Sequence, residues 1–204
     1  MKRVILARHG ESERSVEGLT NGDPAVRVGL TATGREEARR LGVELRDDPI
    51  DLCVTSEFGR AQETADLALE GRDVPRLVLA DFDDIRFGEF EGRPLTEYRA
   101  WAHAHGPEDI CPGGGESRAE TVARYVHGYR ALLARPEETI LLVAHGLPVR
   151  YVLDALERRN PAARVAQVPY AEPFRLTATE LTGAVELLES WVAAPAWATV
   201  ATTP

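Results

Sequence analysis

The 204-residue sequence predicts an α/β fold: a three-layer sandwich with a mostly parallel central sheet, helices on both faces and an antiparallel edge strand. Short apolar segments alternate along the chain with longer segments of helical spacing, which is typical of a parallel sheet covered on both faces. A chain of this length can bury one sizeable core. We therefore predict a single domain over residues 1–204.

The first half of the chain supplies three of the expected strands, at Val4–Ala7, Ile50–Ser56 and Arg76–Phe82. Residues 11–30 are polar and glycine-rich, so we expect a long loop there. The first helix is expected to begin near Thr31–Thr33, because Thr33 and Glu36 have the spacing of a capping box. The second helix follows the second strand and is expected to end at Gly71.

Residues 83–116 are predicted to be irregular, with a short helix around Leu95–His103. Ser117 and Glu120 then have the spacing of a second capping box, which predicts the start of a long amphipathic helix.

The last part of the chain begins with the fourth expected strand, Thr139–Ala144. Pro148 suits the first turn of the helix that follows. Two alternating runs on either side of Thr182 and Gly183, "FRLTATEL" and "AVELLESWV", predict an antiparallel hairpin at a sheet edge. Residues 194–204 are weakly patterned and are predicted to be a tail.

Composition excludes several classes of protein. The net charge of −9 argues against a nucleic-acid partner, and no apolar run approaches the ~20 residues of a membrane span. The two cysteines, Cys53 and Cys111, form no C-x-x-C motif, which favours a reducing, cytoplasmic location. The oligomeric state is left open, with a homodimer as one alternative.

Polar residues follow the predicted strands where each strand ends. Arg8 and His9 follow the first strand and His145 follows the fourth, while Arg60 begins the helix after the second. An acidic run, residues 81–84, follows the third strand. Since ligands of such sheets bind beyond the carboxyl ends of the strands, we expect these side chains to meet there.

This set of residue types favours phosphate chemistry. Arg8 and Arg60 can present planar forks of donors to phosphate oxygens, and an imidazole can attack phosphorus as a nucleophile. A carboxylic acid can protonate the leaving oxygen and later activate water. The alternative, a metal held by His9, His145 and Asp84, is disfavoured because the neighbouring arginines would repel a cation. We therefore expect no metal and no cofactor.

Several segments together resemble the histidine phosphatase (phosphoglycerate mutase-like) superfamily. "LARHGESE" resembles its Arg-His-Gly signature, and "TSEFGRAQETA" resembles its Ser-x-x-x-Arg-Ala segment. "GLTATGREEARRLG", "DDIRFGEFEGRPLTEY", "PGGGES" and "VAHGLPVR" follow in the order and spacing of the family. The resemblance covers nearly the whole chain.

The resemblance implies a role for each matching residue. His9 would be the nucleophile that is phosphorylated during the reaction. Arg8, Arg60 and His145 would form the phosphate pocket, with His145 also counted among the catalytic residues. No cofactor would be needed.

Two positions depart from the family pattern. The family usually has a glutamate as proton donor four residues before the glycine of its Phe-Gly motif, and this chain has Asp84 there. Aspartate is shorter by one C–C bond, about 1.5 Å. A neighbour such as Asp83 is therefore an alternative donor. Ser15 stands where many members have asparagine, and its hydroxyl can still donate one hydrogen bond to phosphate.

The function expected from these observations is hydrolysis of a small phosphorylated metabolite through a phosphohistidine. A mutase of the same family is one alternative. Such mutases are typically longer, and the compact spacing from Asp84 to His145 favours hydrolysis. The other alternative is a non-catalytic protein that binds a phosphorylated ligand, motivated by Ser15 and Asp84. The sequence does not identify the substrate.

Overall fold

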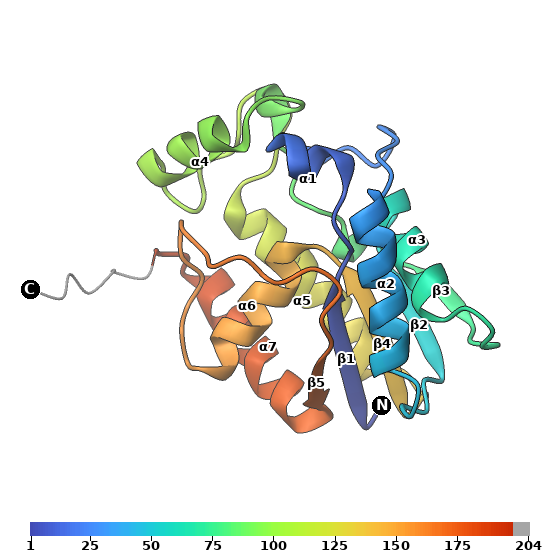
Figure 1. Cartoon of the computed structure of the whole chain (residues 1–204). Coiled ribbons are helices and arrows are strands. Elements are labelled where there is room, and N and C mark those ends of the chain that lie inside the picture. The colour runs from blue at the N-terminus through green and yellow to red at the C-terminus, as the bar shows by residue number, and fades with distance from the viewer. Residues whose placement is uncertain (198–204) are drawn as a thin grey trace, which may run out of the picture.

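A computed structural model describes residues 1–197 of the chain. Its core is a five-stranded sheet of order β3-β2-β4-β1-β5, in which only the β1–β5 pair is antiparallel (Figure 1). The strands are β1 (Arg3–Arg8), β2 (Leu52–Thr55), β3 (Arg76–Val78), β4 (Thr139–Ala144) and β5 (Phe174–Thr177). The predicted mostly parallel sheet with an antiparallel edge strand is confirmed.

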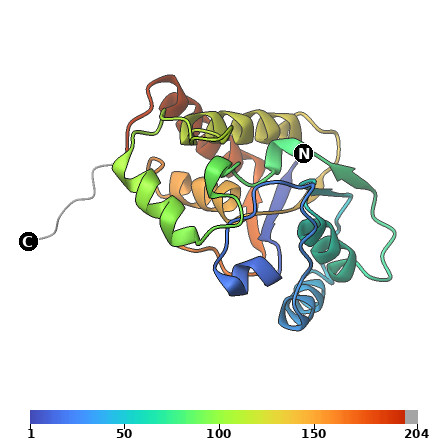
Figure 2. The same cartoon turned by 90° about the horizontal axis from the view of Figure 1, so that it is seen from above.

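Helices cover both faces of the sheet, as Figure 2 shows from above. Along β1, Val4 and Leu6 point into one apolar cluster, whereas Ile5 and Ala7 point into the other. This alternation follows from the two-residue period of a strand. The first cluster is covered by α5 (Arg118–Leu133), α6 (Gly146–Leu156) and α7 (Ala178–Ala193), and the second by α2 (Ala32–Glu44) and α3 (Gly59–Ala68).

Two short helices lie beyond the carboxyl ends of the strands: α1 (Glu13–Glu17) and α4 (Leu95–Ala104) (Figure 1). The predicted helix around Leu95–His103 corresponds to α4. The expectation that residues 11–30 form only a loop was wrong, because α1 lies within them. Gly18, at φ 68°, ends α1 in the left-handed region that glycine adopts at low cost.

The predicted C-terminal hairpin was wrong. Only the first half of its first run forms a strand, β5, and the chain then continues from Ala178 as α7 through Thr182 and Gly183. Thr177 and Glu180 form a capping box that starts α7. The apolar residues beyond it recur at helical spacing and are buried, which gives the helix more core contact than an edge strand would have; they are Leu181, Ala184, Val185, Leu188 and Trp191.

Two further boundaries differ from expectation. The N-cap of α2 is Thr31 rather than Thr33, because the Thr31 side chain accepts a hydrogen bond from the Gly34 backbone N–H at 3.0 Å. Strand β3 stops at Val78, and the chain turns into a short 3₁₀ helix, Ala80–Phe82, which carries the Phe82 ring into the core.

Other sequence predictions are confirmed. Ser117 and Glu120 make a complete capping box at the start of α5, and Pro148 lies in the first turn of α6. Part of the predicted tail, residues 198–204, lies outside the described residues. Within the described residues, none of the helices combines the length and the apolar character needed to cross a membrane.

Candidate active site

A cavity of about 180 Å³ opens beyond the carboxyl ends of the strands. The predicted residues Arg8, His9, Ser15, Arg60 and Asp84 all line it. His145 does not line the cavity. Its side chain is fully buried directly behind Arg60. The structure therefore brings all six predicted residues to one place, with His145 one layer deeper than expected.

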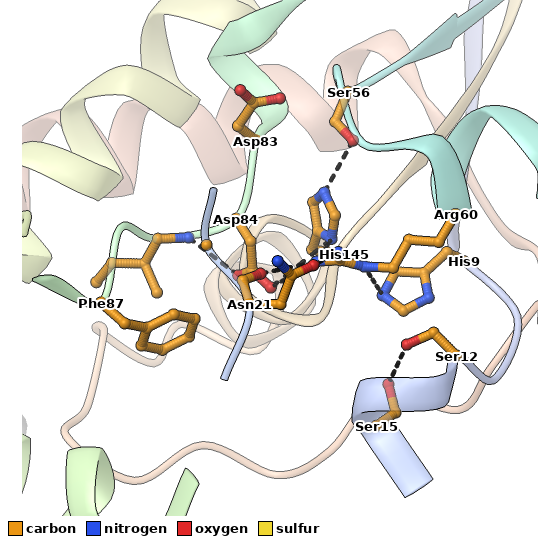
Figure 3. Close-up of polar contacts among 12 residues, drawn as sticks. His9, Ser12, Ser15, Asn21, Ser56, Arg60, Asp83, Asp84, Phe87 and His145 are labelled. Atoms are coloured by element: carbon orange, nitrogen blue, oxygen red, sulfur yellow. Dashed lines mark hydrogen bonds and ion pairs between the residues drawn. The ribbon is translucent and has the colours of Figure 1, made fainter. Parts of the chain in front are cut away.

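Arg60 is the centre of this arrangement (Figure 3). Its Nε donates to His9 Nε2 at 3.1 Å and its Nη2 contacts His145 Nδ1 at 3.2 Å. The same Nη2 lies 3.5 Å from an Asp84 carboxylate oxygen. Arg60 comes from the first turn of α3 and is only 4% exposed. Burial lowers the pKa of the Arg60 guanidinium to about 10, although the Asp84 carboxylate opposes that shift.

The His9 ring is held in one tautomer. Its Nδ1 lies 2.7 Å from the Gly10 carbonyl oxygen and must donate to it, whereas its Nε2 accepts from Arg60. Burial lowers the pKa of His9 well below its usual value, and the Arg60 and Arg8 charges add to this effect. The ring is therefore neutral, and Nε2 carries the free electron pair on the side of Arg60.

His145 is neutral for related reasons. Its Nδ1 accepts from Arg60, so the proton lies on Nε2, which is 2.8 Å from Ser56 Oγ. Burial is the main cause of the lowered pKa of His145, followed by the Arg60 charge. The Phe58 ring packs edge-on against the imidazole at 4.7 Å, and the two histidine rings are 5.2 Å apart.

Asp84, rather than Asp83, is the carboxylate that faces the histidines. One Asp84 oxygen is 3.7 Å from His145 Nδ1, and burial raises the pKa of this carboxyl group. The Asp83 carboxylate points away from both histidines (Figure 3) and accepts a hydrogen bond from the Glu57 backbone N–H at 2.8 Å. Burial raises the pKa of Asp83 to about 6, but this group does not line the cavity.

Arg8 closes another side of the cavity. Its Nη1 donates to the Val168 carbonyl oxygen at 2.9 Å, and its guanidinium lies 3.9 Å from the centre of the Tyr170 ring. The Arg8 Nε is buried and has no hydrogen-bond partner among the described residues. Ser12 and Ser15 also line the cavity, and their hydroxyl groups pair at 2.7 Å.

Three residues that make polar contacts in the site were not predicted. Asn21 accepts from Arg60 twice, at its side-chain oxygen and, at 3.1 Å, at its carbonyl oxygen. Ser56 holds His145, and Thr64 Oγ1 accepts from the Gly10 backbone N–H at 3.0 Å. Ser56 carried a signal, because it directly follows a strand. Asn21 lies in an irregular segment and no spacing pattern marks it.

Gly10 has a steric role beside His9. A Cβ atom at this position would lie 2.4 Å from the Gly34 carbonyl oxygen, so a larger residue would push the loop away from α2. The close approach of these two backbones fixes the direction in which the chain leaves β1. It therefore helps to set the position of the His9 ring.

No group of three or more histidine, cysteine or acidic side chains is arranged to hold a metal ion within residues 1–197. The Arg60 guanidinium contacts His9, His145 and Asp84, the three residues of the disfavoured metal-site alternative. A positive charge in that place opposes cation binding. The arrangement suits an oxyanion instead.

Comparison with known proteins identifies the family. Residues 4–193 match the histidine phosphatase superfamily (branch 1). The chain belongs to this superfamily. The sequence-based resemblance is thereby confirmed, and the family includes proteins named as phosphatases and as phosphoglycerate mutases.

Individual relatives represent both activities. The chain is 43% identical over 152 residues to the adenosylcobalamin/alpha-ribazole phosphatase of Salmonella typhimurium. This alignment covers 70% of this chain and 73% of that protein. It is 31% identical over 214 aligned positions to a 2,3-bisphosphoglycerate-dependent phosphoglycerate mutase of Brucella melitensis, covering 93% and 99%. The crystal structure of the alpha-ribazole phosphatase from Shigella flexneri superposes with a TM-score of 0.71 at 28% identity, covering 85% of this chain and 89% of that one.

These matches correct one argument from the sequence. A mutase was expected to be longer than this chain, yet 93% of this chain aligns with 99% of the Brucella mutase. Length therefore does not separate a hydrolase from a mutase here.

Proposed function

We propose that the protein is a cofactor-independent phosphomonoesterase that cleaves a small phosphorylated metabolite through a phosphohistidine. One observation carries the proposal: His9 Nε2, a raised-pKa carboxyl group at Asp84 and the guanidinium of Arg60 converge on one cavity. The 43% identity to a protein named as a phosphatase supports hydrolysis.

In the first step the free electron pair of His9 Nε2 attacks phosphorus. The N–P bond forms, the ester P–O bond breaks, and the leaving oxygen takes the proton of Asp84. The hydrogen bond from His9 Nδ1 to the Gly10 carbonyl stabilises the positive charge that develops on the ring. The raised pKa of Asp84 suits a group that must carry a proton before this step.

In the second step water attacks the phosphohistidine. Asp84, now a carboxylate, accepts a proton from that water as the new O–P bond forms and the N–P bond breaks. Inorganic phosphate leaves, and His9 and Asp84 return to their starting protonation states.

The cationic groups stabilise the phosphoryl group. The Arg60 N–H that contacts His9 would turn to a phosphate oxygen, because His9 Nε2 must be free to attack. The buried Nε of Arg8 is an orphan donor that an oxyanion would satisfy. A bound dianion would also favour the protonated form of His145, whose positive charge would act on the phosphoryl group from behind Arg60. Ser15 supplies a further donor at the wall.

A mutase is the second candidate, favoured by the full-length match to a protein of that name. In a mutase the phosphoryl group on His9 would be returned to another hydroxyl group of the same molecule rather than to water. The partition between water and the second hydroxyl group decides between the two activities.

The test is a phosphate-release screen over many monoesters, run with 3-phosphoglycerate isomerisation measured in parallel. Rapid quenching with ³²P-labelled substrate should trap label on wild-type protein and none on His9→Gln. Isomerisation faster than phosphate release would reverse the order of the two candidates. Phosphate binding without turnover of any ester would leave only a binding protein.

We also propose a cytoplasmic location and a small phosphorylated substrate as partner, with a homodimer as an open alternative. Both cysteines are free and buried, which is compatible with a reducing compartment. Size-exclusion chromatography with light scattering measures the oligomeric state.

A further inference from the structure

Arg118 lines the same cavity as His9 and comes from a different part of the chain. It is the first residue of α5, and its side chain is only 7% exposed. Burying a guanidinium costs free energy unless an anion compensates it. The start of a helix makes the position worse for a cation, because the helix dipole is positive there.

The protein gives Arg118 no carboxylate partner among the described residues. Its Nε donates to the Tyr98 hydroxyl at 3.0 Å and its Nη1 to the Tyr151 hydroxyl at 2.6 Å. Burial raises the pKa of Tyr98, so this partner is a neutral phenol. The third nitrogen, Nη2, has no hydrogen bond to the described part of the chain.

The two tyrosines orient the guanidinium without neutralising it. Both are 1% exposed and are held by packing: Tyr98 lies against the Phe87 ring at 4.7 Å, and Tyr151 is a residue of α6 that packs in the first apolar cluster. Arg118 therefore lines the cavity as a fixed and uncompensated cation. The exposed Arg99 lines the same cavity and adds positive charge to it.

We propose that Arg118 binds a second anionic group on the leaving part of the substrate. This inference rests on the proposed function, since it extends the same cavity away from the reacting phosphoryl group. The substrate class is a phosphomonoester whose alcohol portion carries a carboxylate or a second phosphate. Either group can accept two hydrogen bonds from a guanidinium fork.

Matched pairs of esters test the inference. 3-Phosphoglycerate and sn-glycerol 3-phosphate differ by a carboxylate, and so do 4-carboxyphenyl phosphate and phenyl phosphate. Wild-type protein should bind the carboxylate-bearing member of each pair at least about tenfold more tightly in calorimetric titrations, because charge-assisted hydrogen bonds are the stronger kind. The ratio of kcat/KM values should favour the same member.

Arg118→Gln should lower this preference by about 10- to 100-fold in both affinity and kcat/KM. Arg40→Gln is the matched control: it removes one charge from the exposed surface of α2, far from the cavity lining, and should keep the preference. Arg118→Lys keeps the charge but loses the planar fork, so its preference should be intermediate. If thermal unfolding shows that Arg118→Gln does not fold, the comparison of Arg118→Lys with wild type carries the test.

Tyr151→Phe separates recognition from packing. Loss of one anchoring hydroxyl group should weaken the preference while the ring still fills its place in the core. An equal loss for both members of each pair in Arg118→Gln would show a structural role and overturn the inference. So would a wild-type protein that binds both members equally.

The two proposals fail in different ways. Selective binding of the carboxylate-bearing esters without turnover would support the role of Arg118 and contradict the hydrolase. Turnover without a preference for the carboxylate-bearing esters would support the hydrolase and contradict the role of Arg118. Binding of neither member of either pair would overturn the role of Arg118.

Discussion

The two ends of the cavity differ in how their buried arginines are compensated. At the phosphate end, Arg60 faces the Asp84 carboxylate at 3.5 Å and donates to His9. At the other end, Arg118 donates to two phenol hydroxyl groups and to no other group within residues 1–197. Both arginines lie in the first turn of a helix. The difference teaches that a protein with a net charge of −9 can still hold strong local positive potential in one cavity.

The compensated end is suited to chemistry and the uncompensated end to recognition. Asp84 must release and regain a proton. The nearby Arg60 charge limits how far burial raises the pKa of Asp84. Arg118 has no proton to exchange and only has to remain charged and oriented. Substitutions at the two ends should therefore change different kinetic constants.

The largest effect is expected at His9. His9→Gln should lower kcat by about 10⁶-fold, the order seen when the nucleophile of a covalent hydrolase is removed. Affinity for an ester should change far less, because Arg8 and Arg118 remain. Single-turnover kinetics and calorimetry measure the two quantities. The exposed His103→Gln is the control and should behave as wild type; residual fast turnover in His9→Gln would exclude His9 as nucleophile.

Asp84→Asn should have the next largest effect, and its size should depend on the leaving group. With an alkyl phosphate, kcat should fall by about 10²- to 10⁴-fold, because an alkoxide needs a proton. With 4-nitrophenyl phosphate the fall in the first step should be much smaller, since nitrophenolate leaves unprotonated. Burst kinetics on the two esters measure this contrast. An equal fall in the rate of that step for both esters would assign Asp84 a role other than proton donor. Asp83→Asn, at the neighbouring position, is the matched control variant.

Asn21→Ala should lower kcat/KM by about tenfold. The side chain accepts a hydrogen bond from Arg60, and a bond of this kind to a charged group contributes enough to account for one factor of ten. Preference for an anionic leaving group should be unchanged, because Asn21 contacts Arg60 and not Arg118. Steady-state kinetics on the matched esters check both statements; a changed preference would show that the two ends are coupled.

The smallest effect is on stability. The pKa of Asp84 is raised in the folded state, so ionisation of this carboxyl group lowers the free energy of unfolding. The loss is complete above the folded-state pKa and is absent below the unfolded-state pKa of 3.8. Asp84→Asn should therefore increase the free energy of unfolding by about 1 kcal/mol at neutral pH. The gain should shrink as pH falls. Urea denaturation at several pH values measures it, and a gain independent of pH would contradict the electrostatic cause.

The sequence predicted the sheet and most of the helices, and its errors have local physical causes. At the C-terminus, "FRLTATEL" alternates like a strand for its first half, but Thr177 and Glu180 also have capping-box spacing. Alternation alone cannot separate the last strand from the start of a helix. Burial of Leu181 and Leu188 against α5 and α6 decides it in favour of the helix.

For the site, the sequence by itself determined which residue types follow the strands, because parallel strands bring their carboxyl ends to one edge. That is why Arg8, His9 and Arg60 could be predicted. Only the tertiary structure decided that Asp84 rather than Asp83 faces the histidines, and that His145 lies behind Arg60. These outcomes depend on side-chain direction and on contacts between segments that are distant along the chain, and no spacing pattern records either.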